Sequence, residues 1–128
     1  MALRDMLKVL VVDDMSTSRG LLLQVLDGLG IRHVEYADNG RIGIQRARET
    51  LPHLVISDLY MPELNGLQLL QQLRHDPATR KIGFILVTGR SDPTVIQTGK
   101  KLGMNNLLEK PFTPASMKAA IEAVVGRL

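Results

Sequence analysis

The sequence predicts an α/β fold in which helices cover both faces of a doubly wound, parallel sheet. Short apolar runs and longer segments with helical spacing alternate five times along the chain. Four of the runs stop abruptly at polar residues, as Leu54-Val-Ile-Ser-Asp58 does. Runs this short and apolar are typical of strands buried on both faces, and right-handed crossovers between them place helices on both sides of the sheet.

The apolar runs predict five strands, over residues 8–13, 33–36, 54–58, 83–88 and 106–109. Helical spacing predicts helices over residues 16–29, 40–50 and 93–102, a third helix after Gly66 and a last one from Pro114. We expect Ser16 and Asp92 to cap the starts of their helices and Thr113-Pro114 to open the last helix. Gly30 and Pro52 are expected to stop helices.

The apolar faces of the helices can also be assigned from their spacing. Leu67, Leu70 and Leu73 are the expected buried positions of the third helix. The fourth helix contains Thr98 and Gly99, which are poor helix formers, so it is the weakest helix by sequence and a candidate movable element.

Length and composition limit the class of protein. The 128 residues predict a single domain, 1–128, without a separate output domain. The absence of cysteine leaves no disulfides or thiolate metal sites, and no apolar run is long enough to span a bilayer. We therefore expect a cytoplasmic protein without membrane insertion.

The net charge of +3 raises the question of nucleic-acid binding. The sixteen basic residues, however, are scattered from Arg4 to Arg127 and are not accompanied by a series of aromatic residues. We expect no nucleic-acid partner.

The expected sheet brings several polar residues together. Five strands of this architecture commonly take the order 2-1-3-4-5, and ligands bind beyond the carboxyl ends of the strands where the order reverses. Asp13 and Asp14 lie at the end of the first strand, Asp58 ends the third, Thr88 ends the fourth and Lys110 follows the fifth. These side chains are expected to share one edge of the sheet.

The chemistry of this group indicates a metal ion and a phosphoryl group. Three neighbouring carboxylates repel one another unless a cation lies among them, and an all-oxygen ligand set favours Mg²⁺. Thr88 and Lys110 offer a hydroxyl and an ammonium to an anionic phosphoryl group. Asp58 lies between these two sets, so it is the candidate nucleophile that would form an acyl phosphate.

These motifs resemble the receiver domains of two-component response regulators. The resemblance is carried by Asp13-Asp14, Asp58 with Met61-Pro62 and Gly66, Thr88-Gly89 and Lys110-Pro111-Phe112, and it extends over nearly the whole chain. The stretch from Val11 to Arg19 is most similar to single-domain chemotaxis regulators, the CheY-like members. The flavodoxin-like 2-1-3-4-5 order is a known property of this family as well as an inference from the strand count.

The resemblance implies a role for each site residue. Asp58 would accept phosphate from a histidine kinase, and Asp14, Asp58 and the backbone carbonyl of Tyr60 would bind Mg²⁺. Asp13 would act on the metal through water. Thr88 would act as the switch and Lys110 would hold the phosphoryl group, with the Lys110–Pro111 bond in the cis form.

The resemblance also implies a monomeric signalling protein rather than a conventional enzyme, although it would catalyse its own phosphotransfer and dephosphorylation. Its affinity for a target, such as the flagellar motor switch in chemotaxis, would change on phosphorylation. One departure from the family pattern is Leu107, which occupies a position where many receivers have an aromatic switch residue. Tyr60 and Arg90 occupy positions that in the family influence the access of water to the acyl phosphate.

Three alternatives remain open at the level of sequence. A haloacid-dehalogenase-type hydrolase also uses an aspartyl phosphate, but its nucleophile lies on the first strand in an Asp-x-Asp pattern. A flavin or nucleotide carrier could share the fold, but no glycine-rich loop follows the first strand. A phosphate sink would drain a shared kinase without binding a motor. His33, His53 and His75 are expected to be exposed and are poor candidates for metal ligands.

Overall fold

The computed structural model describes residues 2–90 and 92–128. Its parallel sheet has the predicted order β2-β1-β3-β4-β5. The strands are β1 (Lys8–Val12), β2 (His33–Ala37), β3 (Leu54–Asp58), β4 (Gly83–Thr88) and β5 (Asn106–Glu109). The doubly wound fold predicted from the sequence is therefore confirmed.

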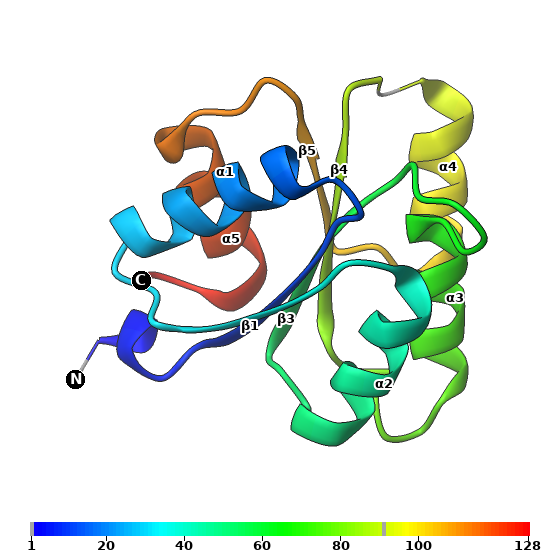
Figure 1. Cartoon of the computed structure of the whole chain (residues 1–128), viewed down its shortest axis with the longest axis horizontal. Coiled ribbons are helices and arrows are strands. Elements are labelled where there is room, and N and C mark those ends of the chain that lie inside the picture. The colour runs from blue at the N-terminus through cyan, green and yellow to red at the C-terminus, as the bar shows by residue number, and fades with distance from the viewer. Residues whose placement is uncertain (1, 91) are drawn as a thin grey trace.

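Helices cover both faces of the sheet (Figure 1). One face is covered by α1 (Ser16–Gly28) and α5 (Pro114–Val125), and the other by α2 (Gly40–Thr50), α3 (Gly66–His75) and α4 (Pro93–Leu102). A short 3-10 helix, η1 (Leu3–Asp5), precedes β1. Within residues 2–90 and 92–128, no helix combines the length and apolarity needed to cross a membrane.

Each central strand contributes to two separate cores. In β1, Val9 and Val11 pack under α1 and α5, whereas Leu10 and Val12 pack under α2 and α3. Successive side chains of a strand point to opposite faces, so a strand covered on both sides must be apolar throughout. This is the physical reason for the uninterrupted apolar runs in the sequence.

Most of the predicted helix ends follow local sequence signals, and the start of α1 is the exception. Asp92 and Thr113 cap α4 and α5 through their side chains, and Gly30 has a φ of 82°, in the left-handed region that glycine favours. Ser16 does not cap α1, because the cap position is Met15 and its N–H donates to Asp13 Oδ1 at 3.0 Å. The expectation for Ser16 is therefore wrong.

The buried face of α3 also differs slightly from the prediction. Leu70 and Leu73 are buried as expected, but Leu69 is buried and Leu67 only partly so. The helix is covered by both the sheet and its neighbours α2 and α4, so its apolar surface is wider than a single stripe.

The strand register aligns the polar strand ends at one edge of the sheet. Val12 is paired with Ser57, Asp58 with Val87 and Thr88 with Glu109. The residues that directly follow β1 and β5 therefore lie beside the ends of β3 and β4, which places the candidate site at the carboxyl edge.

Gly66 fixes the start of α3 against the strand that ends at Asp58. A Cβ at Gly66 would lie against the carbonyl oxygen of Asp58 and 2.8 Å from Leu86 Cδ1. Gly66→Ala is therefore expected to lower the free energy of unfolding by about 2 kcal/mol, a typical cost of adding a carbon atom to a well-packed core. Urea denaturation measures this loss.

The matched control for Gly66→Ala is Gly20→Ala, in α1. A Cβ at Gly20 meets nothing within 4 Å among the described atoms, so alanine should stabilise the helix by roughly 0.5–1 kcal/mol. Equal effects of the two substitutions would contradict the close approach at Gly66.

Candidate functional site

Three carboxylates meet at the carboxyl edge of the sheet. Asp13 and Asp14 follow β1, Asp58 ends β3, and one oxygen from each lies within 4.8 Å of the others. Asp13 is completely buried and Asp58 is 6% exposed. The structure therefore brings together the three acids that the sequence predicts as neighbours.

Two oxygens of this cluster are buried without a hydrogen-bond partner among the described residues, Asp13 Oδ2 and Asp14 Oδ1. Burying a carboxylate oxygen without a partner is costly, and like charges nearby increase the cost. A hard divalent cation with oxygen ligands would satisfy both oxygens, so the residues present fit Mg²⁺.

Asp58 lies in an environment that opposes its charge. Burial raises the pKa of the Asp58 carboxyl above its ordinary value, and the nearby Asp13 raises it further. Lys110 and the N–H of Leu59, which donates to Asp58 Oδ1 at 3.0 Å, act in the opposite direction. Burial has the largest effect on this pKa, so the ion pair with Lys110 does not fully offset the cost of burying the charged carboxylate.

Lys110 approaches the cluster from the end of β5. Its Nζ lies 3.4 Å from Asp58 Oδ1 and donates to Ser18 Oγ at 3.0 Å. The Lys110–Pro111 bond is cis, as the family resemblance implies. In the strand order, Asp58 on β3 lies between β1, which the two other acids follow, and β5, which Lys110 follows.

Thr88 is buried at the end of β4, but its hydroxyl bonds to its own loop. Thr88 Oγ1 donates to the carbonyl of Arg90 at 2.9 Å and accepts from the Arg90 N–H at 3.1 Å. Thr88 thus lies at the predicted edge while its hydroxyl is occupied outside the carboxylate cluster.

The remaining predicted residues lie around the site rather than inside the cluster. Leu107 is partly buried and packs with the core under α3 and α4. Tyr60 follows Asp58 by two residues, and its side chain is exposed. His33, His53 and His75 are exposed, as expected, and His53 Nδ1 accepts from the Lys8 N–H.

Sequence reasoning missed two contributors, Ser18 and Arg19, which are adjacent in α1. Arg19 Nη1 donates to the carbonyl oxygen of Asp13 at 2.9 Å, and its guanidinium stacks 4.9 Å from the centre of the Tyr36 ring. Arg19 thereby connects the acidic loop to α1 and β2. Within a helix, neither residue type by itself indicates which neighbour it will contact, so no local signal identifies them.

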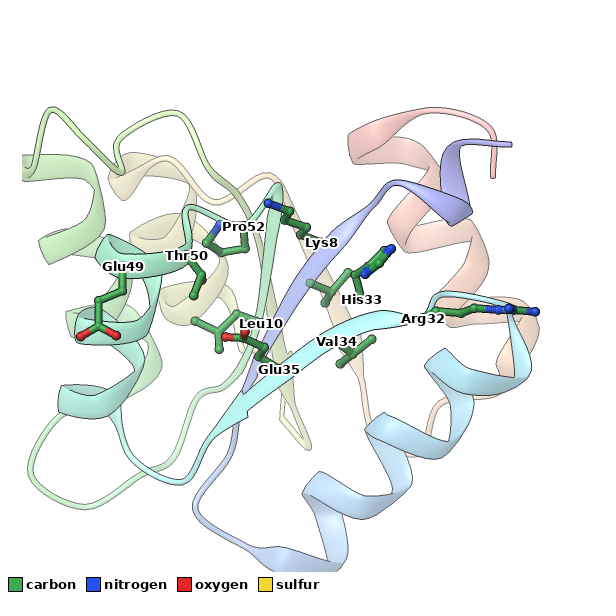
Figure 2. A pocket seen from close by; sticks show the side chains of 10 residues that line it. Lys8, Leu10, Arg32, His33, Val34, Glu35, Glu49, Thr50 and Pro52 are labelled. Carbon is green, nitrogen blue, oxygen red and sulfur yellow. The ribbon is translucent and has the colours of Figure 1, made fainter. Parts of the chain in front are cut away.

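Two hollows lie at opposite edges of the molecule. A groove of about 920 Å³ runs beside the site, and it is lined in part by Met15, Ser18, Leu21, Lys110 and Phe112. Another, of about 580 Å³, lies at the amino ends of β1 and β2 (Figure 2). The second is lined by side chains of both charges, including Lys8 and Glu49, and it is separate from the carboxylates.

Comparisons with known proteins match this chain to a family. The model of the response regulator receiver domain matches residues 9–122. A Rhizobium etli protein named as a CheY chemotaxis protein is 45% identical over 128 residues, covering 100% of this chain and 99% of the relative. Chemotaxis protein CheY1 of Helicobacter pylori is 36% identical over 121 residues, covering 94% of this chain and 98% of the relative.

A comparison with solved structures finds the same fold in a chemotaxis protein. The crystal structure of chemotaxis protein CheY4 of Vibrio cholerae superposes with a TM-score of 0.87 at 28% identity. The match covers 93% of this chain and 98% of that chain.

Proposed function

Because this chain belongs to the receiver domains of two-component response regulators, we propose that it accepts a phosphoryl group on Asp58 from a histidine kinase. Receivers of this family are signalling proteins rather than conventional enzymes. We further propose that the protein is a cytoplasmic monomer. Phosphorylation would change its affinity for a target protein.

The chemistry proposed for Asp58 is a displacement at phosphorus. A carboxylate oxygen of Asp58 attacks the phosphorus of phosphohistidine, the phosphorus–nitrogen bond breaks, and the imidazole nitrogen leaves with the bonding electron pair. Lys110 stabilises the charge on the phosphoryl oxygens, because its ammonium already lies 3.4 Å from Asp58 Oδ1.

Asp13, Asp14 and Asp58, with the backbone carbonyl of Tyr60, are the proposed ligand set for Mg²⁺, with Asp13 acting through water. When bound, this ion would neutralise the carboxylates and the phosphoryl oxygens. The observation that carries the proposal is a pair of buried oxygens, Asp13 Oδ2 and Asp14 Oδ1, that have no hydrogen-bond partner within residues 2–90 and 92–128. They lie beside an aspartate that contacts a lysine.

The names of the relatives point to chemotaxis as the pathway. The Rhizobium etli and Helicobacter pylori relatives are both named as chemotaxis proteins, and they match this chain over almost its whole length. We therefore place the output in motility signalling, with the flagellar motor switch as the candidate target.

The test is phosphotransfer from purified histidine kinases in the presence and absence of Mg²⁺. We expect labelling that is sensitive to chelation of the metal and that increases the recovery of a target protein in a pull-down. Labelling without any gain in target binding would indicate a phosphate sink. Sustained hydrolysis of phosphomonoesters would instead support the hydrolase alternative and contradict the proposal.

Thr88 is expected to transmit the signal more strongly than Leu107. Turning the Thr88 hydroxyl toward a phosphoryl group breaks both of its bonds to Arg90, so the loop after β4 must move with it. That loop leads into α4, whose Val95 and Leu102 pack in the same core as Leu107. Leucine lacks the area and the polar tip of an aromatic switch residue.

The corresponding measurement is target affinity with and without the phosphoryl mimic beryllofluoride. Thr88→Ala should reduce the mimic-dependent gain in affinity more than Leu107→Ala reduces affinity, and both variants should keep nearly normal Mg²⁺ binding. If Leu107→Ala alone erased the gain, leucine would be the main switch.

A further inference from the structure

The hydrogen bond between Ser18 and Lys110 connects the first turn of α1 to the loop after β5. Lys110 Nζ donates to Ser18 Oγ at 3.0 Å, whereas its distance to Asp58 Oδ1 is 3.4 Å. Charge-assisted contacts to a carboxylate are normally about 2.7–2.9 Å long. The ammonium therefore makes its well-formed bond with a neutral hydroxyl and a longer contact with the carboxylate.

The position of Ser18 explains how it can control this lysine. The Lys110 side chain is 29% exposed, and a lysine head group on a flexible stem can adopt many orientations unless a partner restrains it. Ser18 lies in α1, which is held against α5 and β1 by the core. A hydroxyl on this rigid element fixes the ammonium through one of its three N–H groups. A second N–H makes the longer contact with Asp58, and the third is left for a further acceptor.

We propose that Ser18 is a positioning residue for phosphorylation, which holds the Lys110 ammonium beside Asp58 without closing a tight ion pair. This inference rests on the proposed function of Asp58. The arrangement avoids a tight ion pair that would hold the Asp58 carboxylate away from phosphorus, and it keeps one Lys110 donor available for an incoming phosphoryl oxygen. Preorganised donors of this kind lower the barrier because they need little rearrangement during the reaction.

The neighbouring hydroxyl of Thr17 provides a matched control. Thr17 belongs to the same turn of α1 and lines the same groove, but its side chain is exposed and is not hydrogen-bonded to any described residue. Removing it changes the groove without changing the restraint on Lys110.

The experiment measures the rate of phosphorylation from acetyl phosphate with Mg²⁺ by intact-mass spectrometry, because a small donor does not depend on kinase docking. Ser18→Ala should slow phosphorylation about three- to tenfold, the loss expected for one hydrogen bond. Ser18→Thr should restore most of the rate, and Thr17→Ala should match wild type. In a Lys110→Ala background, Ser18→Ala should have no further effect.

A second measurement is independent of phosphorylation. In ¹⁵N NMR spectra of lysine side chains, the protons of the Lys110 ammonium should exchange slowly with water in wild type and in Thr17→Ala. In Ser18→Ala they should exchange rapidly. Rapid exchange in wild type, an unchanged or faster phosphorylation rate in Ser18→Ala, or an effect that persists without Lys110 would each overturn the proposal. If wild type itself were not phosphorylated, the proposed function would fail, while the NMR result would still decide whether Ser18 restrains Lys110.

Discussion

Asp58→Asn is expected to abolish labelling by any phosphodonor while the protein stays folded. Asparagine keeps the shape of the side chain but removes the carboxylate oxygen that attacks phosphorus. Phosphotransfer followed by autoradiography measures the loss, with Asp38→Asn as a control at an exposed acid after β2. Label that persists in Asp58→Asn and resists acid, as on serine or threonine, would contradict the assignment.

The stability of the same variant provides a second check. The pKa of the Asp58 carboxyl is raised in the folded state, so folding favours its neutral form. The contribution of Asp58 to stability is therefore fully present below its pKa in the unfolded chain, and it is lost as the pH rises through its pKa in the folded protein. Asparagine is neutral throughout this range. Asp58→Asn should therefore be more stable than wild type to urea at pH 7 without metal, and the difference should disappear below the ordinary pKa of aspartate.

Asp14→Asn is expected to weaken Mg²⁺ binding about tenfold or more. Even the replacement of a residue that only supports a metal ligand commonly lowers metal affinity by about 10–100-fold. The reason is Asp14 Oδ1, which is buried without a partner among the described residues and lies within 4.8 Å of the other two acids. Calorimetric titration measures the affinity. The metal-free fold should gain stability, because repulsion among the carboxylates falls.

The control for Asp14→Asn is again Asp38→Asn, which removes one negative charge near the same edge but outside the cluster. It should leave Mg²⁺ affinity almost unchanged. A similar affinity for wild type and Asp14→Asn would remove Asp14 from the proposed ligand set.

The sequence was informative about the fold because every central strand is covered on both faces. Uninterrupted runs such as Val9 to Val12 cannot be accommodated in a sheet with one solvated face, so the parallel architecture followed from them. The strand order then brought Asp13, Asp14 and Asp58 together without any information about their side chains. The proximity of these three acids depends on topology, whereas the cis Lys110–Pro111 bond is implied by the family resemblance.

The missed parts depend on side-chain geometry. Ser16 was the expected cap of α1, yet the start of this helix is fixed by the bond from the Met15 N–H to Asp13. Ser18 contacts a residue 92 positions away, and this pairing depends on how α1 is oriented over the end of β5. The sequence also places Thr88 at the edge but cannot show that its hydroxyl bonds to Arg90.

The most direct test of phosphorylation at Asp58 is chemical mapping of the modified residue. The protein would be phosphorylated in the presence of Mg²⁺, reduced with borohydride to convert an acyl phosphate to an alcohol, digested and sequenced by mass spectrometry. We expect a single modified residue, homoserine at position 58, which is absent when the metal is chelated. Modification at Asp13 or Asp14 in place of Asp58, or equal modification without metal, would contradict it.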